Sequence, residues 1–306
     1  MAIKKKANKF KANRRKLLFY IIIMAYPIAQ FCIFYIGVNF NSILLSIKQF
    51  DYDKGQYTFC GFNNFIEVFN NIKDIEYLKI AFNNSFIAYF WMLIFNGAFT
   101  LIFSYYIFKK CWGSSFFSVI LYLPSIIPSI AIIIIYKYFC ENAIPELASS
   151  VFNHSMGGLL SDLDTLFPAL LVFGLWCGFG SKMLIYSGTM GGVDNSILES
   201  AQLDGVNTFQ EFLLIIIPSI WPTITTYLVV GLAGIFTNQL GTYGFFLTTA
   251  EYQAYTVGYY LYRDTIIGTI GDYPYLAAFG IVLTAITLPV VLIVKKLMTK
   301  YGPSCD

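Results

Sequence analysis

Residues of the types that carry out catalysis are few in this chain and lie far apart. There is one histidine, His154, and the six cysteines include no CxxC pair. Zinc sites, thiol redox centres and histidine-based catalytic triads therefore lack their parts. No phosphate-binding G-x-x-x-x-G-K-[ST] sequence occurs either. We expect no catalytic residue, no metal and no cofactor in this chain, and we expect His154 to be a solvated loop residue.

The composition indicates whether the chain folds in water or in lipid. Hydrophobic residues make up 57% of its 306 residues and charged residues only 12%, whereas soluble domains carry about 25% charged residues. The 20 basic residues do not gather into an aromatic-rich stripe, so nucleic acid is not an expected partner. Long uncharged stretches separate the charges, which is typical of a chain in lipid. We expect an all-α integral membrane protein.

Six uncharged segments predict six transmembrane helices, because about 20 apolar residues in a helix cross the bilayer core. They are residues 17–36, 80–108, 111–136, 165–181, 212–250 and 273–294. The first follows a basic prefix, as a signal peptide would, but its apolar run is too long and no small-x-small cleavage site follows. We therefore predict a basic cytoplasmic tail at 1–16, a six-span domain at 17–298 and a short cytoplasmic tail at 299–306.

The distribution of basic residues predicts the orientation of these spans. With the N-terminus inside, the inner segments hold 14 Lys and Arg residues and the outer segments hold 6. This is the bias expected of cytoplasmic loops, so both termini are predicted to be cytoplasmic. Lys182 would then lie at the inner end of the fourth span, where its long side chain can reach the interface.

One inner loop, at about 188–212, departs from this bias. It carries the acids Asp194, Glu199, Asp204 and Glu211, with only Lys182 at its edge. Such a loop favours contact with a basic protein surface over contact with lipid headgroups, although a merely solvated loop is the alternative. Ser196 and Glu199 have the spacing of a capping box that starts a short helix, and Gly205 would end it in a left-handed turn. A second helix and Pro218 then lead back into the membrane.

The same loop resembles the EAA motif of the binding-protein-dependent ABC importer permeases, E-A-A-x-x-x-G followed by I-x-L-P. The matching positions are Glu199, Ala201, Gly205, Ile215 and Pro218, and the departures are Ser200, Val206 and Ile217. Asp204 and Phe212 are typical of the carbohydrate-uptake subfamily, the maltose and glycerol-phosphate type. The resemblance extends over most of the chain, including the paired prolines at 124 and 128.

The resemblance implies a type I ABC importer permease fold in a bacterial cell membrane. In that family the EAA helix sits in a groove of a cytoplasmic ATPase, which binds the ATP and Mg²⁺ that this chain lacks a site for. It also implies a second EAA-type permease and an extracytoplasmic sugar-binding protein as partners. The residues expected to couple to the ATPase are Glu199 by an ion pair, Ala201 by close packing and Gly205 by the turn, with their neighbours Ser200 and Asp204.

The segment 212–250 is too long for one span, and its second half is polar and glycine-rich. Irregular backbone at membrane depth is tolerated only inside protein or beside a wet cavity, so this half is expected to line a pathway. Buried amides are costly without a purpose, and aromatic rings can stack on sugars. The predicted pathway residues are Trp176, Asn238, Gln239 and Tyr243.

The sequence favours the import of a neutral sugar, with an oligosaccharide preferred, because charges are nearly absent from the spans. A permease for glycerol-phosphate or another small polar solute is the first alternative. A secondary carrier is a second alternative, but carriers usually place ionisable groups in their spans for ion coupling. A membrane enzyme would need a catalytic set that the chain does not have.

Overall fold

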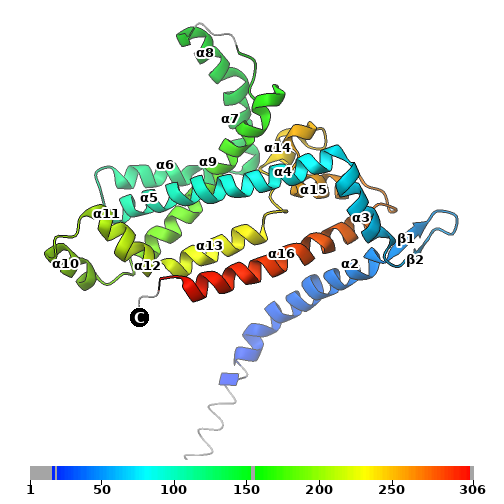
Figure 1. Cartoon of the computed structure of the whole chain (residues 1–306), viewed down its shortest axis with the longest axis horizontal. Helices are drawn as coiled ribbons and strands as arrows, with labels where there is room; N and C mark the ends of the chain where they lie inside the picture. Colours follow the sequence, from blue (N-terminus) through cyan, green and yellow to red (C-terminus); the bar gives the residue numbers. More distant parts are fainter. Residues whose placement is uncertain (1–15, 18, 153–155, 304–306) are drawn as a thin grey trace, which may run out of the picture. The chain divides into compact units, whose positions relative to one another are not determined.

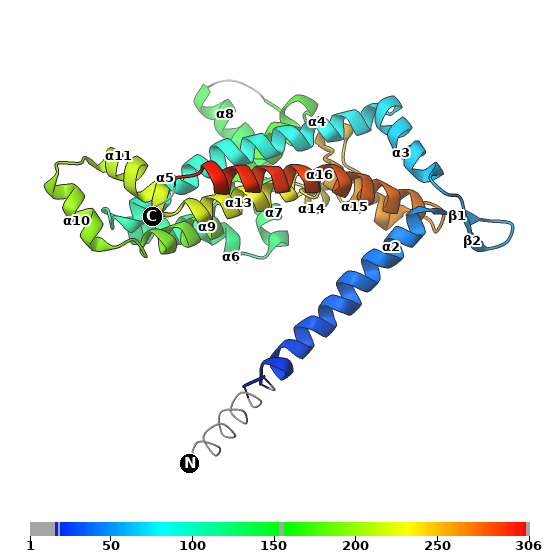
Figure 2. The same ribbon diagram turned by 60° about the horizontal axis from the view of Figure 1, so that its bottom comes forward.

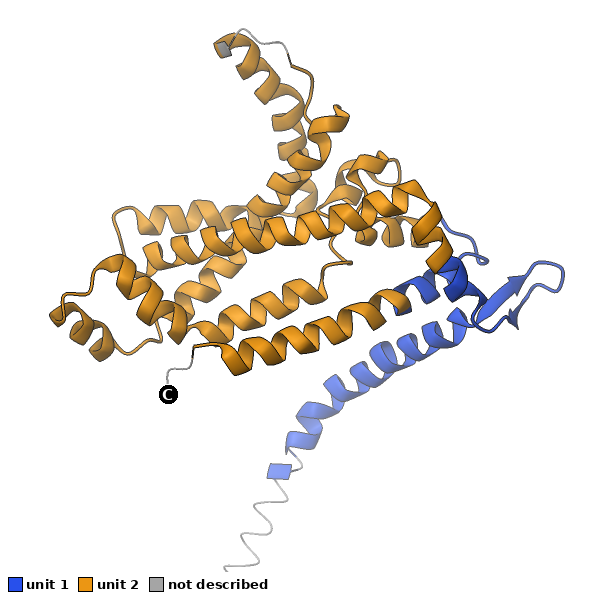
Figure 3. Ribbon diagram, in the orientation of Figure 1, with its two compact units in different colours: residues 1–68, 268–281 blue, residues 69–267, 282–306 orange. Residues whose placement is uncertain are grey.

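The computed structural model describes residues 16–17, 19–152 and 156–303. His154, most of the predicted basic tail at 1–16 and the end of the predicted tail at 299–306 lie outside these residues. The chain divides into two compact units, coloured separately in Figure 3. Unit 1 comprises residues 1–68 and 268–281, and unit 2 comprises residues 69–267 and 282–306.

The structure is almost entirely helical, as the sequence predicts. In unit 1 the helix of residues Phe19–Ser46 contains the π-helix η1 (Phe31–Gly37) and α2 (Val38–Ser46), and it is followed by strands β1 (Lys48–Asp51) and β2 (Gln56–Phe59). Helices α3 (Asn63–Asp74) and α16 (Tyr273–Tyr301) begin in unit 1 and continue into unit 2. The other elements belong to unit 2: α4 (Glu76–Trp91), η2 (Met92–Asn96), α5 (Gly97–Phe108), α6 (Ser114–Ile126), α7 (Ser129–Tyr138), η3 (Phe139–Ala143), α8 (Ile144–Phe152), α9 (Leu163–Met190), α10 (Asn195–Leu203), α11 (Thr208–Glu211), η4 (Phe212–Ile216), α12 (Ile217–Ser219), α13 (Trp221–Ala233), α14 (Thr242–Phe246), η5 (Tyr252–Ala254) and α15 (Val257–Ile267).

Four described helices are long and apolar enough to cross a membrane: Phe19–Ser46, Glu76–Phe108, Leu163–Met190 and Tyr273–Tyr301. Two further helix pairs pass the same test but are sharply bent. Ser114–Ile126 and Ser129–Val151 meet at 105°, and Thr208–Ser219 and Trp221–Ala233 meet at 70°. By length and composition the described residues therefore hold four candidate spans, or up to six if each bent pair is one span. The bend of 105° occurs where Pro128 removes a backbone donor.

Unit 1 holds a short β-hairpin beside the end of its long helix. Strands β1 and β2 pair antiparallel, with Lys48 opposite Phe59. The buried Asn64 side chain donates hydrogen bonds to the carbonyl oxygens of Ser46 at 2.7 Å and Lys48 at 2.8 Å. The Tyr57 hydroxyl donates to the carbonyl of Ile270 at 3.1 Å. These contacts join the hairpin to both sequence segments of its unit.

In unit 2, α5 and α9 lie side by side and are held by small and polar side chains (Figure 1). Asn96, Thr100 and Ser104 recur every four residues and are fully buried. Ser104 Oγ donates to the carbonyl of Met183 at 3.0 Å, and Asn96 Nδ2 donates to that of Leu175 at 3.2 Å. Interhelical bonds of this kind hold membrane helices together where no hydrophobic effect can.

A glycine lets α9 approach α6. A Cβ at Gly180 would lie 2.8 Å from the carbonyl oxygen of Leu121 and 2.8 Å from Cα of Tyr122. Real side chains do not come so close to backbone atoms, so only glycine allows this crossing. Beyond it, α7 turns away from α6 and stays against α9, where the Tyr136 hydroxyl donates to the carbonyl of Ala169 at 2.8 Å, while Figure 1 shows α8 projecting from the rest of unit 2.

Helix α9 extends further than the sequence predicts. The uncharged segment ends at Ser181, but the helix continues to Met190. Lys182 is therefore about 12 Å from the end of α9, at 1.5 Å per residue, rather than at the end of a span. The uncharged segment therefore underestimates the length of this helix, because a single charged residue does not stop one.

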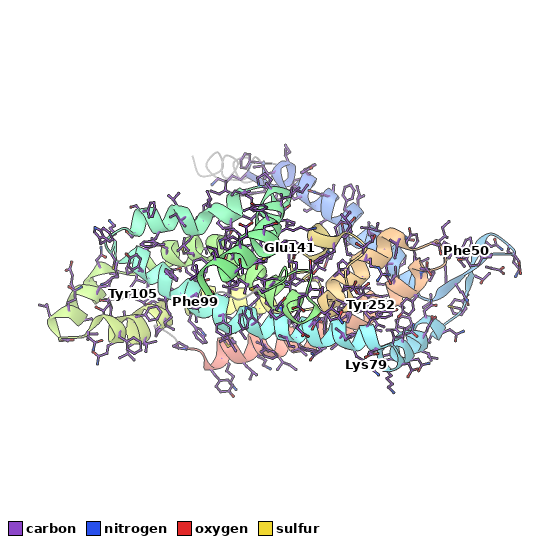
Figure 4. The ribbon with its side chains drawn as sticks, turned by 90° about the horizontal axis from the view of Figure 1, so that it is seen from above. Phe50, Lys79, Phe99, Tyr105, Glu141 and Tyr252 are labelled. Carbon is purple, nitrogen blue, oxygen red and sulfur yellow. The ribbon has the colours of Figure 1, made fainter. Side chains whose placement is uncertain are left out.

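The two ends of unit 2 differ in character. Helices α10 and α11 lie at one end, and α14 and α15 lie towards the other (Figures 1 and 2). In Figure 4, Tyr105 lies beside the yellow-green α10–α11 segment and Tyr252 lies towards the opposite end. The loop singled out by its acids and the segment singled out by its glycines are thus well separated within one unit.

Candidate functional site

Helix α10 is capped by Asp194. The Asp194 carboxylate accepts a hydrogen bond from the backbone N–H of Ser196 at 2.9 Å. This bond holds the pKa of Asp194 below its ordinary value of 3.8, because it favours the charged form. The predicted capping box of Ser196 and Glu199 is therefore wrong: the helix begins two residues earlier, at Asn195, with Asp194 as its N-cap. Asp is as good an N-cap as Ser, so residue type alone does not decide between them.

The turn after α10 depends on Gly205, as predicted. Its φ is +77°, in the left-handed region that glycine reaches without strain. A true capping box follows, in which Asn207 Oδ1 accepts from the N–H of Gln210 at 2.9 Å and Gln210 Oε1 accepts from the N–H of Asn207 at 3.0 Å. The predicted second helix thus starts at Thr208.

The side chains of α10 divide into an outward and an inward face. Glu199, Ser200 and Asp204 are exposed, so they are free to meet a partner. Ala201 is only 8% exposed, which means that its close packing is made inside this chain. Two apolar side chains that the sequence reasoning did not single out are strongly exposed: Leu203 at 90% and Phe209 at 69%. Their outward position could not be read from their type.

Glu211, which the sequence analysis noted only as one of the acids of the loop, attaches the loop to the helix bundle. Glu211 is 3% exposed and accepts from Lys109 Nζ at 2.8 Å and from the Tyr105 hydroxyl at 3.0 Å. The Tyr105 ring packs with that of Phe212, their centroids 4.9 Å apart. Behind these contacts lies a buried cluster that combines α5, α9, α10 and the helices after α11: Tyr105, Tyr186, Met190, Leu198, Ile216 and Ile220.

A cavity of about 460 Å³ opens within unit 2. It is lined by residues of α4, η2, α5, α9, α13 and the turn after α13. Its walls are mostly apolar and rich in glycine, with the tyrosines at 89, 186 and 227 and the amides Asn96 and Asn238 among the polar groups. A volume of this size is in the range of small-ligand sites.

Asn238 is the one predicted pathway residue that lines this cavity. The turn that carries it is irregular, as expected, with Leu240 at φ +51° and Gly241 at φ +78°. The Thr256 hydroxyl donates to the carbonyl of Asn238 at 2.8 Å. Thr256 is positioned in turn by α4, since Ser85 Oγ accepts from the N–H of Val257 at 2.9 Å.

The other three predicted pathway residues are not among those that line the cavity. Trp176 packs against Tyr136, with ring centroids 6.1 Å apart, and Tyr243 meets Tyr262 edge-on at 4.8 Å. The carbonyl of Gln239 accepts from the Thr242 hydroxyl at 2.6 Å. The aromatic residues act in packing within this chain, and Gln239 supports a turn through its backbone.

Asn96 and Lys182 are the cavity residues that sequence reasoning missed or set aside. Asn96 is fully buried at the end of the π-helix η2, and Lys182 Nζ donates to its Oδ1 at 3.3 Å. π-Helical turns inside α-helices are frequent at functional sites, but nothing in the sequence marks this one. Within residues 16–17, 19–152 and 156–303, no group of His, Cys, Asp and Glu could hold a metal ion.

Comparison with known proteins decides the family. The sequence profile of the binding-protein-dependent transport system inner membrane components matches residues 98–303, which include α5, α9, the loop of α10 and α11, and the segment around Asn238. This chain belongs to that family. It is therefore a membrane component of a transport system and not a catalytic enzyme, as the sequence predicts. The match spans both the loop and the larger part of the cavity.

Individual relatives of the permease are distant. A probable starch degradation products transport system permease of Thermoanaerobacterium thermosulfurigenes is 25% identical over 128 residues, which cover 42% of this chain and 44% of that protein. The alpha-glucoside transport system permease of Rhizobium meliloti is 23% identical over 291 residues, 90% of this chain and 78% of that one. The chain thus spans less than half the length of the first relative.

The fold matches solved structures over nearly its whole length. A chain of a bacterial ABC transporter involved in the import of the acidic polysaccharide alginate superimposes with a TM-score of 0.77, covering 96% of this chain and 99% of that chain. The sequence identity is 21%, so the likeness concerns the fold. The predicted ABC importer permease fold is confirmed.

Proposed function

We propose that this permease is the membrane subunit of an ATP-driven importer of a sugar, with an oligosaccharide as the expected solute. The observation that carries the proposal is the connection between the exposed face of α10 and the cavity. Glu211 ties the loop to Lys109 at the end of α5, and the same helix carries Ala98 and Leu101 of the cavity wall. A movement of the loop would therefore reach the cavity through one rigid helix.

The exposed face of α10 and the family of the chain indicate which proteins would assemble with it. A separate cytoplasmic ATPase would bind ATP and Mg²⁺ and would receive the exposed face of α10, with Glu199 meeting a basic residue. The exposed Leu203 and Phe209 are apolar anchors of the kind that dominate protein interfaces. A second permease of the same family and an extracytoplasmic sugar-binding protein would complete the importer. The relatives named for starch products and alpha-glucosides support a sugar as the solute.

A charge reversal at the exposed acid tests the docking role. Glu199→Lys should abolish co-purification with the ATPase and ATP-driven sugar uptake, because like charges would meet at the interface. Glu251→Lys, which reverses another exposed acid outside the loop, is the matched control and should leave both unchanged. Undiminished association of the Glu199→Lys protein would refute the docking role.

The orientation belongs to the same proposal. We place both termini in the cytoplasm, because the 14 to 6 division of basic residues follows the positive-inside rule. Reporter fusions after Lys110, Gly205 and Asp306 should give a cytoplasmic signal, and a fusion after Phe152 should give an external one. A cytoplasmic signal at Phe152 would overturn this topology.

A permease for glycerol-phosphate or another small polar solute is the second candidate. The cavity favours it in one respect, since Lys182 places a cation in the wall. Uptake assays with glycerol 3-phosphate and maltotriose, each in the presence of the cognate binding protein, would separate the two solutes. ATP-driven uptake of glycerol 3-phosphate alone would replace the sugar proposal.

A further inference from the structure

Lys182 is the only charged residue that lines the cavity in the described part of the chain. Its helix runs on for eight residues, to Met190, so its Cα is about 12 Å from the helix end. Side chains of a helix start out towards its N-terminus, which here leads away from α10. The amine therefore points into the helix bundle, where it contacts Asn96.

The described residues satisfy the Lys182 amine only in part. Its hydrogen bond to Asn96 Oδ1 at 3.3 Å is long, and Asn96 is already engaged by the Thr100 hydroxyl at 3.2 Å. Within the described residues no carboxylate lies within 4 Å of Nζ, and an ammonium group has three hydrogens to donate. A cation inside a membrane protein is costly unless a counter-charge or water meets it. The cavity beside it is the space from which that counter-charge can come.

The volume and the polar lining of the cavity indicate that a solute, rather than a single side chain, supplies the counter-charge. Its volume of about 460 Å³ is far larger than one carboxylate needs, and further polar groups stand along it. Asn238 lies at one part of the wall, while Tyr186 and Tyr227, whose rings are 5.2 Å apart, lie at another. An elongated solute could place an acidic group at Lys182 and its hydroxyls against these residues.

We propose that Lys182 binds an anionic group of the transported solute, so that the cavity takes an acidic sugar carrying a carboxylate or a phosphate. This inference rests on the proposed function and narrows its substrate class. It replaces the expectation of a neutral sugar, which depended on a lysine at the interface. Lys182 acts by charge-assisted hydrogen bonding, which is stronger than bonding between neutral groups.

The first test measures the amine itself in the assembled importer in lipid vesicles. A water-soluble acylating reagent should modify Lys182, and the rate is followed by mass spectrometry. Trigalacturonate, which carries carboxylates, or glucose 6-phosphate should slow this modification about tenfold, equivalent to about 1.4 kcal/mol, whereas maltotriose should not. Whichever of the two acids protects identifies the anionic group.

Three results of this test would overturn the inference. Equal protection by maltotriose would mean that charge is irrelevant. No protection by either acid would mean that no anion binds there. An amine that reacts only after the second permease has been removed would mean that a carboxylate of that subunit holds it. None of these results depends on transport, so loss of the proposed function would be seen separately, as absence of any ATP-driven sugar uptake.

The second test uses variants in the uptake assay. Lys182→Met should reduce uptake of the protecting acid about tenfold relative to maltotriose, and Lys182→Arg should retain most of it, because the charge is kept. Lys296→Met removes an exposed lysine on α16, outside the cavity, and should leave both rates unchanged. Equal loss of both sugars in Lys182→Met with no recovery in Lys182→Arg would assign the residue a structural role instead.

Discussion

Lys109 Nζ lies 2.8 Å from Oε1 and 3.0 Å from Oε2 of Glu211, and this ion pair joins the end of α5 to the end of α11. The carboxylate is almost fully buried, while the lysine side chain remains 26% exposed. Removing one partner of such a pair leaves an uncompensated charge in the protein. The ion pair therefore ties the position of the loop to that of α5.

Glu211→Gln is expected to destabilise the fold by about 2 kcal/mol, less than for a fully buried pair because Lys109 can reach water. Thermal unfolding and deuterium exchange of residues 207–216 are the measurements. The double variant Lys109→Met with Glu211→Gln should recover part of the loss, since no unpaired charge remains. Strict additivity of the two single effects would show that the ion pair contributes nothing.

Gly205 should be replaced best by Asn, less well by Ala and worst by Pro. A Cβ at this position meets nothing within 4 Å, so the penalty for Ala arises from the left-handed φ alone, about 1 kcal/mol. Asn adopts this conformation more readily, and Pro cannot adopt it at all. We expect uptake to decrease in the order Asn, Ala, Pro. Full activity of the proline variant would contradict the need for this turn.

Gly180→Ala should destabilise the bundle by about 1–3 kcal/mol, because its Cβ would collide with the backbone of α6. Gly188→Ala on the same helix is a matched control, since its Cβ would meet nothing within 4 Å. The control should unfold at the same temperature or slightly higher, because alanine is the better helix former. Equal unfolding temperatures for both variants would show that the crossing can relax.

Asn238→Ala should weaken sugar uptake, whereas Gln239→Ala should have little effect. Asn238 lines the cavity, and its Oδ1 already accepts from the N–H of Leu240 at 2.9 Å, which leaves Nδ2 for the solute. Loss of one such bond costs about 1 kcal/mol, or about fivefold in affinity. The comparison is made by initial uptake rates at limiting sugar. Equal loss in both variants would restore Gln239 to the pathway.

The cap of α10 should be sensitive to acid. The pKa of Asp194 is lower in the folded protein than the ordinary value of 3.8, so its bond to Ser196 is present at neutral pH. It is lost only when the pH falls through and below that value, because protonation then removes the charge. At pH 7 the backbone amide hydrogens of α10 should exchange faster in Asp194→Ala than in the parent protein. Equal exchange rates in the two proteins would show that the cap is unimportant.

The membrane class, the loop and the family could be predicted from the sequence, because each depends on local patterns. Long uncharged runs predict helices in lipid, and the acids together with Gly205 single out the loop of α10 and α11. A glycine that ends a helix adopts the left-handed conformation for local steric reasons, whatever surrounds it. The irregular segment around Asn238 was also predicted, since its composition excludes a regular span.

Only the tertiary structure decided which residues meet across helices. Glu211 is one of four acids in the loop, and its burial against Lys109 joins two residues that are 102 positions apart in the sequence. The uncharged run ends at Ser181, but α9 continues to Met190, and packing brings the amine of Lys182 to Asn96. Local propensity determines the elements, but the contacts between them follow from packing that no single segment contains.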